Sequence, residues 1–75
     1  MAIVVMESWK VGLMKVSLTK LQVEKLNISL KESKDNVDSL LNGEQIALEI
    51  EDVNLAEEFF KEAERLGVNC KLTIK

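Results

Sequence analysis

The pattern that most constrains the fold lies in the C-terminal part of the chain. Ile46, Leu48 and Ile50 alternate with small or charged residues, which predicts a strand with one buried face. Residues 54–66 then carry apolar side chains at helical spacing, and residues 69–75 alternate again. A strand–helix–strand unit has a right-handed crossover, so its two strands are parallel. They either pair directly or leave room for a third strand between them.

The N-terminal half supplies that third strand and two further helices. Residues 2–6 form an apolar, β-branched run that predicts a strand. Residues 7–16 fit either a loop that packs on the core or a second short strand. We expect Ser17 to cap a helix that runs to about residue 26, and Ser29 to start another that runs to about residue 41.

These elements predict one architecture. If the first strand lies between the two C-terminal strands and antiparallel to both, the sheet order is 2-1-3. The expected fold class is α+β, a two-layer sandwich in the order β-α-α-β-α-β, with a three-stranded antiparallel sheet covered on one face by three helices. The other face would then be partly apolar, through Val4 and Met6.

Capping residues and apolar stripes refine the helices. Ser29 and Glu32 are spaced as a capping box, and Asn54 with Glu57 resembles a second one. Gly67 is suited to end the last helix. On the second helix a core-facing stripe is predicted from residues that fall within one narrow arc, namely Leu30, Ser33, Val37, Leu40 and Leu41.

Length and composition exclude several classes of protein. Seventy-five residues predict a single domain over residues 1–75. The chain has no histidine, and its one cysteine, Cys70, is expected to face inward from the last strand. We therefore expect no enzyme, no catalytic residues, no metal site and no cofactor. The longest apolar runs are too short to span a bilayer, so a cytoplasmic location and no membrane partner are expected.

Charge is unevenly divided. Six lysines against three glutamates give residues 1–34 a net charge of +3, whereas four basic against ten acidic residues give residues 35–75 a net −6. Because the chain as a whole is acidic, nucleic acid is not expected as a partner. The basic half either steers an acidic protein partner or is a solvated surface. Trp9 is similarly open to two interpretations, a cap on the core or an exposed interface anchor.

One segment resembles a known family. Residues 15–35, KVSLTKLQVEKLNISLKESKD, are similar to the two helices and the intervening loop of the C-terminal domain of the bacterial ribosomal stalk protein, large-subunit ribosomal protein seven/twelve. Residues 63–68, AERLGV, resemble the end of that domain's last helix. The resemblance implies a stand-alone short relative with the same fold, although Val23 stands where the family usually carries an arginine.

The resemblance also implies a function. In that family, exposed lysines on the first two helices contact an acidic helix of translation factors. Here Lys15, Lys20 and Lys34 lie at positions that resemble those lysines, and Val23 and Lys31 of the same two helices complete the expected partner-binding residues. The expected function is a small protein–protein interaction module whose partner has an acidic surface, and the resemblance implies a translation factor as that partner. The alternative is a structural or regulatory homo-oligomer without a ribosomal role, assembled through the open sheet face or its edge strands.

Overall fold

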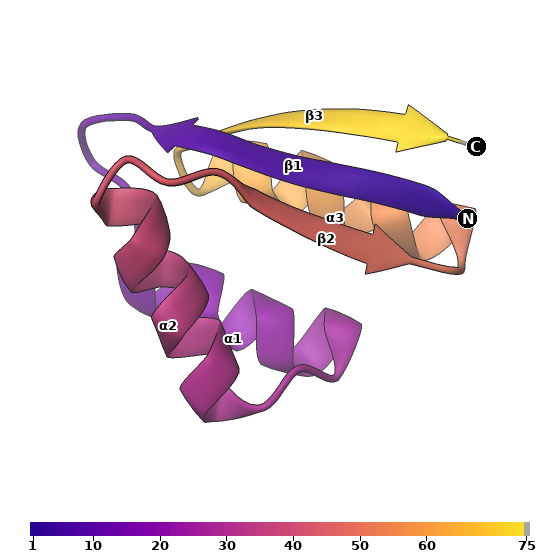
Figure 1. Cartoon of the computed structure of the whole chain (residues 1–75), viewed down its shortest axis with the longest axis horizontal. Helices are drawn as coiled ribbons and strands as arrows, with labels where there is room; N and C mark the ends of the chain where they lie inside the picture. The colour runs from indigo at the N-terminus through magenta and orange to yellow at the C-terminus, as the bar shows by residue number, and fades with distance from the viewer. Residues whose placement is uncertain (75) are drawn as a thin grey trace.

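A computed structural model describes residues 1–74 and confirms the predicted fold class and topology. The strands form one antiparallel sheet in the order β2-β1-β3, and the helices lie on one side of it (Figure 1). In chain order, the elements are β1 (Ala2–Trp9), α1 (Lys15–Leu26), α2 (Leu30–Leu41), β2 (Ile46–Ile50), α3 (Val53–Arg65) and β3 (Val68–Ile74).

The two faces of β1 differ in what they contact. Ala2, Val4 and Met6 are fully buried beneath the helices, opposite the apolar residues of both neighbouring strands. The expectation that Val4 and Met6 reach the open face is therefore wrong. Because side chains alternate along a strand, Ile3 and Val5 occupy the open face instead, and both are partly exposed.

β1 is longer than the sequence predicted, and it contains a bulge. Met6 lies opposite Cys70, but the next pairs are Ser8 with Asn69 and Trp9 with Val68, so Glu7 is an extra residue. Residues 7–9 thus extend the first strand rather than form a second one. The chain then turns through residues 10–14 before α1 begins.

Two of the three predicted helix starts are wrong. α1 begins at Lys15 rather than at Ser17, and its N-cap is Met14, which makes no side-chain cap hydrogen bond. α3 is capped by Asp52, whose Oδ1 accepts from the N–H of Asn54 at 2.9 Å and of Leu55 at 3.2 Å. A carboxylate close to the free N–H groups is a stronger acceptor than the predicted Asn54 amide.

The start of α2 agrees with the prediction. The backbone N–H of Glu32 donates to Ser29 Oγ at 3.2 Å. Ser33, Val37 and Leu40 are buried along the predicted stripe. Leu30 is not, because it lies in the first turn and is 54% exposed, so its assignment to the core was wrong.

The core forms between the sheet and the helices. Phe59 of α3 is its largest fully buried side chain, and the buried apolar cluster includes Leu18, Leu40 and Val68. Cys70 faces the helices as predicted but is only partly buried. Lys75, predicted to face outward, lies outside the described residues.

Candidate protein-binding surface

A buried polar contact fixes how α1 and α2 meet. Gln22 of α1 is fully buried, and its Nε2 donates to the carbonyl oxygens of Leu18 and Ser33, each at 3.3 Å. Asn36 Nδ2 donates to Gln22 Oε1 at 2.9 Å. Because the bonds to Ser33 and from Asn36 join the two helices directionally, they hold one face of the pair in a defined orientation toward solvent.

The outward side of α1 follows from that orientation. With Leu18 and Gln22 turned inward, the 100° step of the helix places Val16, Lys20 and Val23 together on the opposite side. Val16 is 69% exposed and Lys20 is also exposed, whereas Val23 is partly buried. An aliphatic pair thus flanks a lysine on the solvent side of α1.

The structure brings Lys15 and Lys34 together. Both line a shallow groove between α1 and α2, whose other lining residues include Val16 and Asp38. The buried side chain of Val37 also contributes to it. The groove therefore combines apolar surface with two ammonium groups and one carboxylate.

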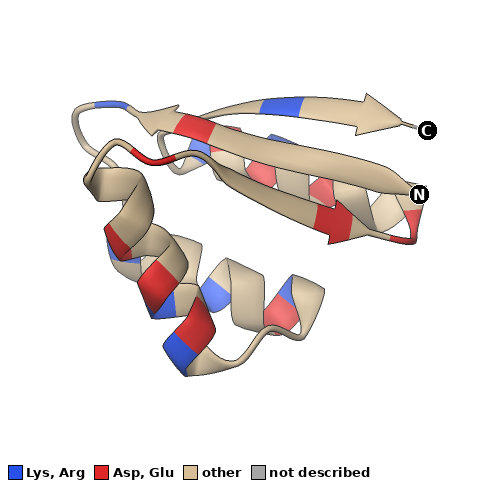
Figure 2. Ribbon diagram, in the orientation of Figure 1, with Lys and Arg blue, Asp and Glu red and all other residues tan. Residues whose placement is uncertain are grey.

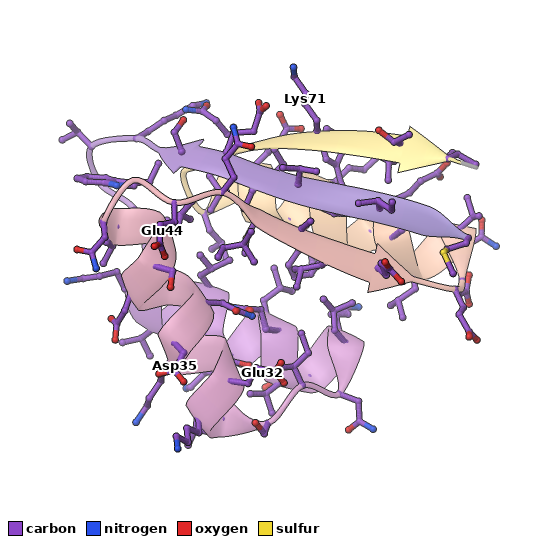
Figure 3. All side chains as sticks on the ribbon, in the orientation of Figure 1. Glu32, Asp35, Glu44 and Lys71 are labelled. Atoms are coloured by element: carbon purple, nitrogen blue, oxygen red, sulfur yellow. The ribbon has the colours of Figure 1, made fainter. Side chains whose placement is uncertain are left out.

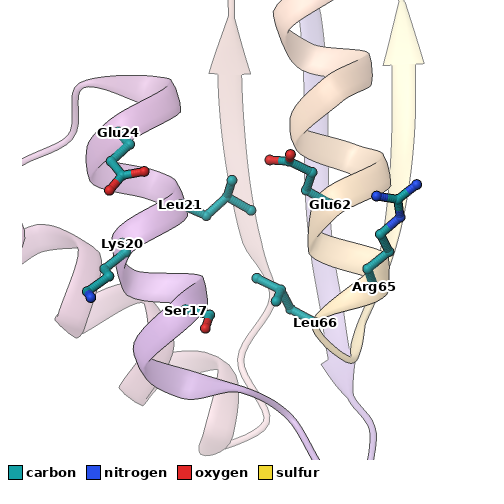
Figure 4. A pocket seen from close by; sticks show the side chains of 7 residues that line it. All are labelled: Ser17, Lys20, Leu21, Glu24, Glu62, Arg65 and Leu66. Atoms are coloured by element: carbon teal, nitrogen blue, oxygen red, sulfur yellow. The ribbon is translucent and has the colours of Figure 1, made fainter.

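Lys20 and Lys31 lie elsewhere on the pair. Lys20 borders a second groove, between α1 and α3, in which Leu21 and Leu66 face each other (Figure 4). In that view the Lys20 side chain extends away from α3. Lys31 is exposed in the first turn of α2. We call the combined surface the α1–α2 face, defined by Lys15, Val16, Lys20, Val23, Leu30, Lys31 and Lys34.

The lysines of the α1–α2 face are not engaged within the described chain. Among residues 1–74, ion pairs join Lys25 to Glu58 and Lys71 to Glu7, each at 3.5 Å, and none involves a lysine of this face. α1 carries three lysines and one glutamate, whereas α2 carries two lysines and three acidic residues (Figure 2). Two of the acidic residues of α2, Glu32 and Asp35, are labelled in Figure 3. The positive charge is therefore concentrated on α1.

Sequence reasoning missed the apolar part of this surface. Val16 was placed before the helix, and Leu30 was assigned to the core. A signal for Val16 exists, since it lies seven residues before Val23 and therefore on the same side of a helix.

Within the described part of the chain, the side chains that could bind a metal or act as a nucleophile do not lie together in one site. No cluster of three or more acidic, cysteine or histidine side chains is placed to hold a metal ion within residues 1–74. Burial, with Glu64 and Glu7 adding to it, raises the pKa of the Cys70 thiol to about 12. The thiol is protonated at neutral pH and is therefore a poor nucleophile.

Comparison with known proteins gives no further identification. No protein-family model matches the chain, and neither the curated proteins nor the solved structures contain a match. Across residues 1–74, every helix is too short or too polar to cross a lipid bilayer.

Proposed function

We propose that this protein is a small protein–protein interaction module that binds an acidic partner through the α1–α2 face. The observation that carries the proposal is the combination of exposed aliphatic side chains, Val16 and Leu30, with lysines that have no ion-pair partner in the described chain. Apolar contacts supply affinity at an interface, and surrounding charges supply steering and selectivity.

The resemblance to the stalk-protein domain supports the same surface and suggests the kind of partner. An amphipathic helix with an apolar stripe and flanking carboxylates is complementary to Val16 and Val23 with Lys20 between them. A translation factor that presents such a helix is the proposed natural partner. Cytoplasmic function and the lack of catalysis belong to this proposal.

A charge-reversal experiment tests the surface. The probe is a synthetic peptide of about five helical turns, about 27 Å long, with leucines on one face and glutamates on the other. Each exposed lysine contributes roughly 0.5–1 kcal/mol, so the double variant Lys20→Glu/Lys34→Glu should bind about tenfold more weakly. Affinity should also fall as salt is raised, because exposed charges are screened.

The matched control changes net charge equally on another helix. Lys61→Glu/Arg65→Glu reverses two exposed cations of α3 and should leave affinity within about twofold. Equal weakening by both double variants would show non-specific attraction and would contradict the proposal. A second experiment tests the translational partner separately. It measures the affinity of a purified bacterial elongation factor for the wild type and for the same two double variants.

A second candidate function is self-assembly through the open sheet face. Ile3 and Val5 lie at its centre, with Glu49 of β2 and Lys71 of β3 on opposite flanks. A two-fold axis along β1 would place each Glu49 near a Lys71 of the second copy. Sedimentation of the protein up to millimolar concentration tests this, and a monomer throughout would exclude it.

A further inference from the structure

Exposed apolar side chains are concentrated in one short stretch. Trp9 is 43% exposed, Val11 100%, Met14 54% and Val16 69%, whereas the other exposed large apolar residues are Leu30 of α2 and, at the opposite end of β1, Met1 and Ile74. Single exposed apolar residues are common on protein surfaces, but contiguous ones mark contact sites. Three of these four residues lie in the segment from the last residue of β1 to the residue before α1, residues 9–14, which we call the apolar loop.

The backbone of the apolar loop is fixed. Lys10 N–H donates to the carbonyl of Gly67 at 2.8 Å, and Met14 N–H donates to the carbonyl of Leu66 at 3.0 Å. A Cβ on Gly67 would lie only 3.1 Å from the Cα of Leu13, so the loop packs directly on the turn between α3 and β3. The exposure of its apolar side chains is thus a property of an ordered loop, so its backbone needs no further ordering on binding.

Met14 stands at a position where local chemistry favours a different residue. α2 and α3 begin with Ser29 and Asp52, whose side chains accept backbone hydrogen bonds, but Met14 leaves the first N–H groups of α1 without a side-chain cap. Methionine is unfavourable at an N-cap and is exposed here. A residue that violates a local stability rule without a packing reason points to a role in binding.

We infer that the apolar loop extends the α1–α2 face into one docking surface for an acidic amphipathic helix of a partner protein. This inference rests on the proposed function. Val23 and Val16 lie about 10 Å apart along α1, and Met14 immediately precedes that helix, so the apolar loop adjoins the N-terminal end of α1. Lys15 and Lys34, which share the groove beside Val16, face the partner's carboxylates.

The size of a stable interface supports the extension. Two helices of 12 residues offer a footprint of roughly 18 by 20 Å, or about 360 Å². A specific interface buries about 800 Å² of accessible surface on each partner, so surface that adjoins the α1–α2 face would add to a stable complex. The apolar loop adds an aromatic and two aliphatic side chains at its end, and tryptophan and methionine are enriched at interface centres.

Trp9 provides a direct test, because it is the only tryptophan in the chain. The probe is the tryptophan-free leucine–glutamate peptide described above. Its binding should shift Trp9 emission to shorter wavelength and reduce quenching by iodide. Met14→Asp should weaken the peptide at least threefold while raising the melting temperature, because aspartate caps α1. Ile74→Asp, at a residue of similar exposure on β3, should leave affinity unchanged.

The outcomes separate this inference from the proposed function. If Lys20→Glu/Lys34→Glu weakens the peptide but Trp9 emission and Met14→Asp binding are unchanged, the apolar loop is not part of the surface and the proposed function survives. If the peptide does not bind, both are overturned. If Trp9 emission shifts when the protein is concentrated without peptide, the apolar loop contacts a second copy of this chain, and the inference is wrong. Val11→Asp, at a fully exposed position, gives a second loop variant that cannot disturb the core.

Discussion

α3 and the α1–α2 pair are attached to the rest of the molecule by different physical means. α3 packs on the sheet through Ala56, Phe59 and Ala63, all fully buried, and its start is capped by a carboxylate. The α1–α2 contact instead contains a fully buried amide, Gln22, and a buried hydroxyl, Ser33 Oγ, that has no hydrogen-bond partner.

This difference separates the part of the molecule that supplies stability from the part that presents a surface. Apolar burial is non-directional and grows with area, so α3 and the sheet tolerate small changes in geometry. A buried polar contact defines one arrangement of two helices but contributes little net free energy, because burial removes its hydration. The α1–α2 pair therefore holds its outward face in position with little gain in stability.

The largest effect is expected in the α3–sheet region. Phe59→Ala removes the largest fully buried side chain and leaves a cavity against the sheet, so it should lower the free energy of unfolding by about 3–5 kcal/mol. Urea denaturation measures this. The matched control is Phe60→Ala. Phe60 follows Phe59 in α3 but is only partly buried, so its replacement should lower the free energy of unfolding clearly less. Equal costs would mean that α3 is not held by this face.

A smaller effect is expected from the buried amide. Gln22→Ala removes its hydrogen bonds and leaves Asn36 Nδ2 and the Ser33 carbonyl without this partner, which should cost about 2–3 kcal/mol. Gln22→Leu keeps most of the side-chain volume, so its free energy of unfolding should lie between those of Gln22→Ala and the wild type. If Gln22→Leu were more stable than the wild type, the network would serve the arrangement of α1 and α2 and not their stability.

Ser33→Ala should have the opposite sign. The hydroxyl is buried without a partner, so its removal should raise the free energy of unfolding by about 1 kcal/mol. Hydrogen exchange should show the gain first at the amides of α1 and α2. A loss of stability would contradict the structure, because it would require a hydrogen bond to Ser33 Oγ in solution.

At neutral pH the smallest effect concerns Cys70, in the α3–sheet region. Its folded pKa is about 12, whereas an unfolded thiol titrates near ~8.5, so only the unfolded state releases the proton between these values. This contribution to stability is complete below the unfolded pKa and is lost as pH rises from there toward the folded pKa. Cys70→Ala should flatten the pH dependence of unfolding in that range. Native-state labelling by a thiol reagent at pH 7 should be slow.

The two regions also differ in how well the sequence predicts them. Strict alternation in β2 and β3 and a clear apolar face in α3 identify these elements and the faces that they bury, because the spacing of apolar residues differs between strands and helices. α1 has no such pattern. Its buried side includes Thr19 and Gln22 while Val16 is exposed, so neither its start nor its outward face follows from hydropathy.

The candidate surface was accordingly predicted in part. The lysines could be placed, since charged residues on helices remain in solvent. The apolar loop could not, because residues 9–14 have no period and their positions depend on hydrogen bonds to Leu66 and Gly67, far away in the sequence. A sequence signal is nevertheless present: several large apolar residues precede α1 at a point where a polar cap is normal.

The extra residue in β1 determines which side of the molecule Trp9 can serve. Pairing is in phase up to Met6, and beyond Glu7 the parity of the strand is inverted, so that Trp9 lies opposite Val68, a residue of the helix-side core. Without the bulge, the indole would alternate onto the bare side of the sheet, away from α1. The one extra residue thus places the Trp9 side chain on the same side of the sheet as the helices. In a strand that was one residue shorter, the same loop sequence would place it on the opposite side of the sheet.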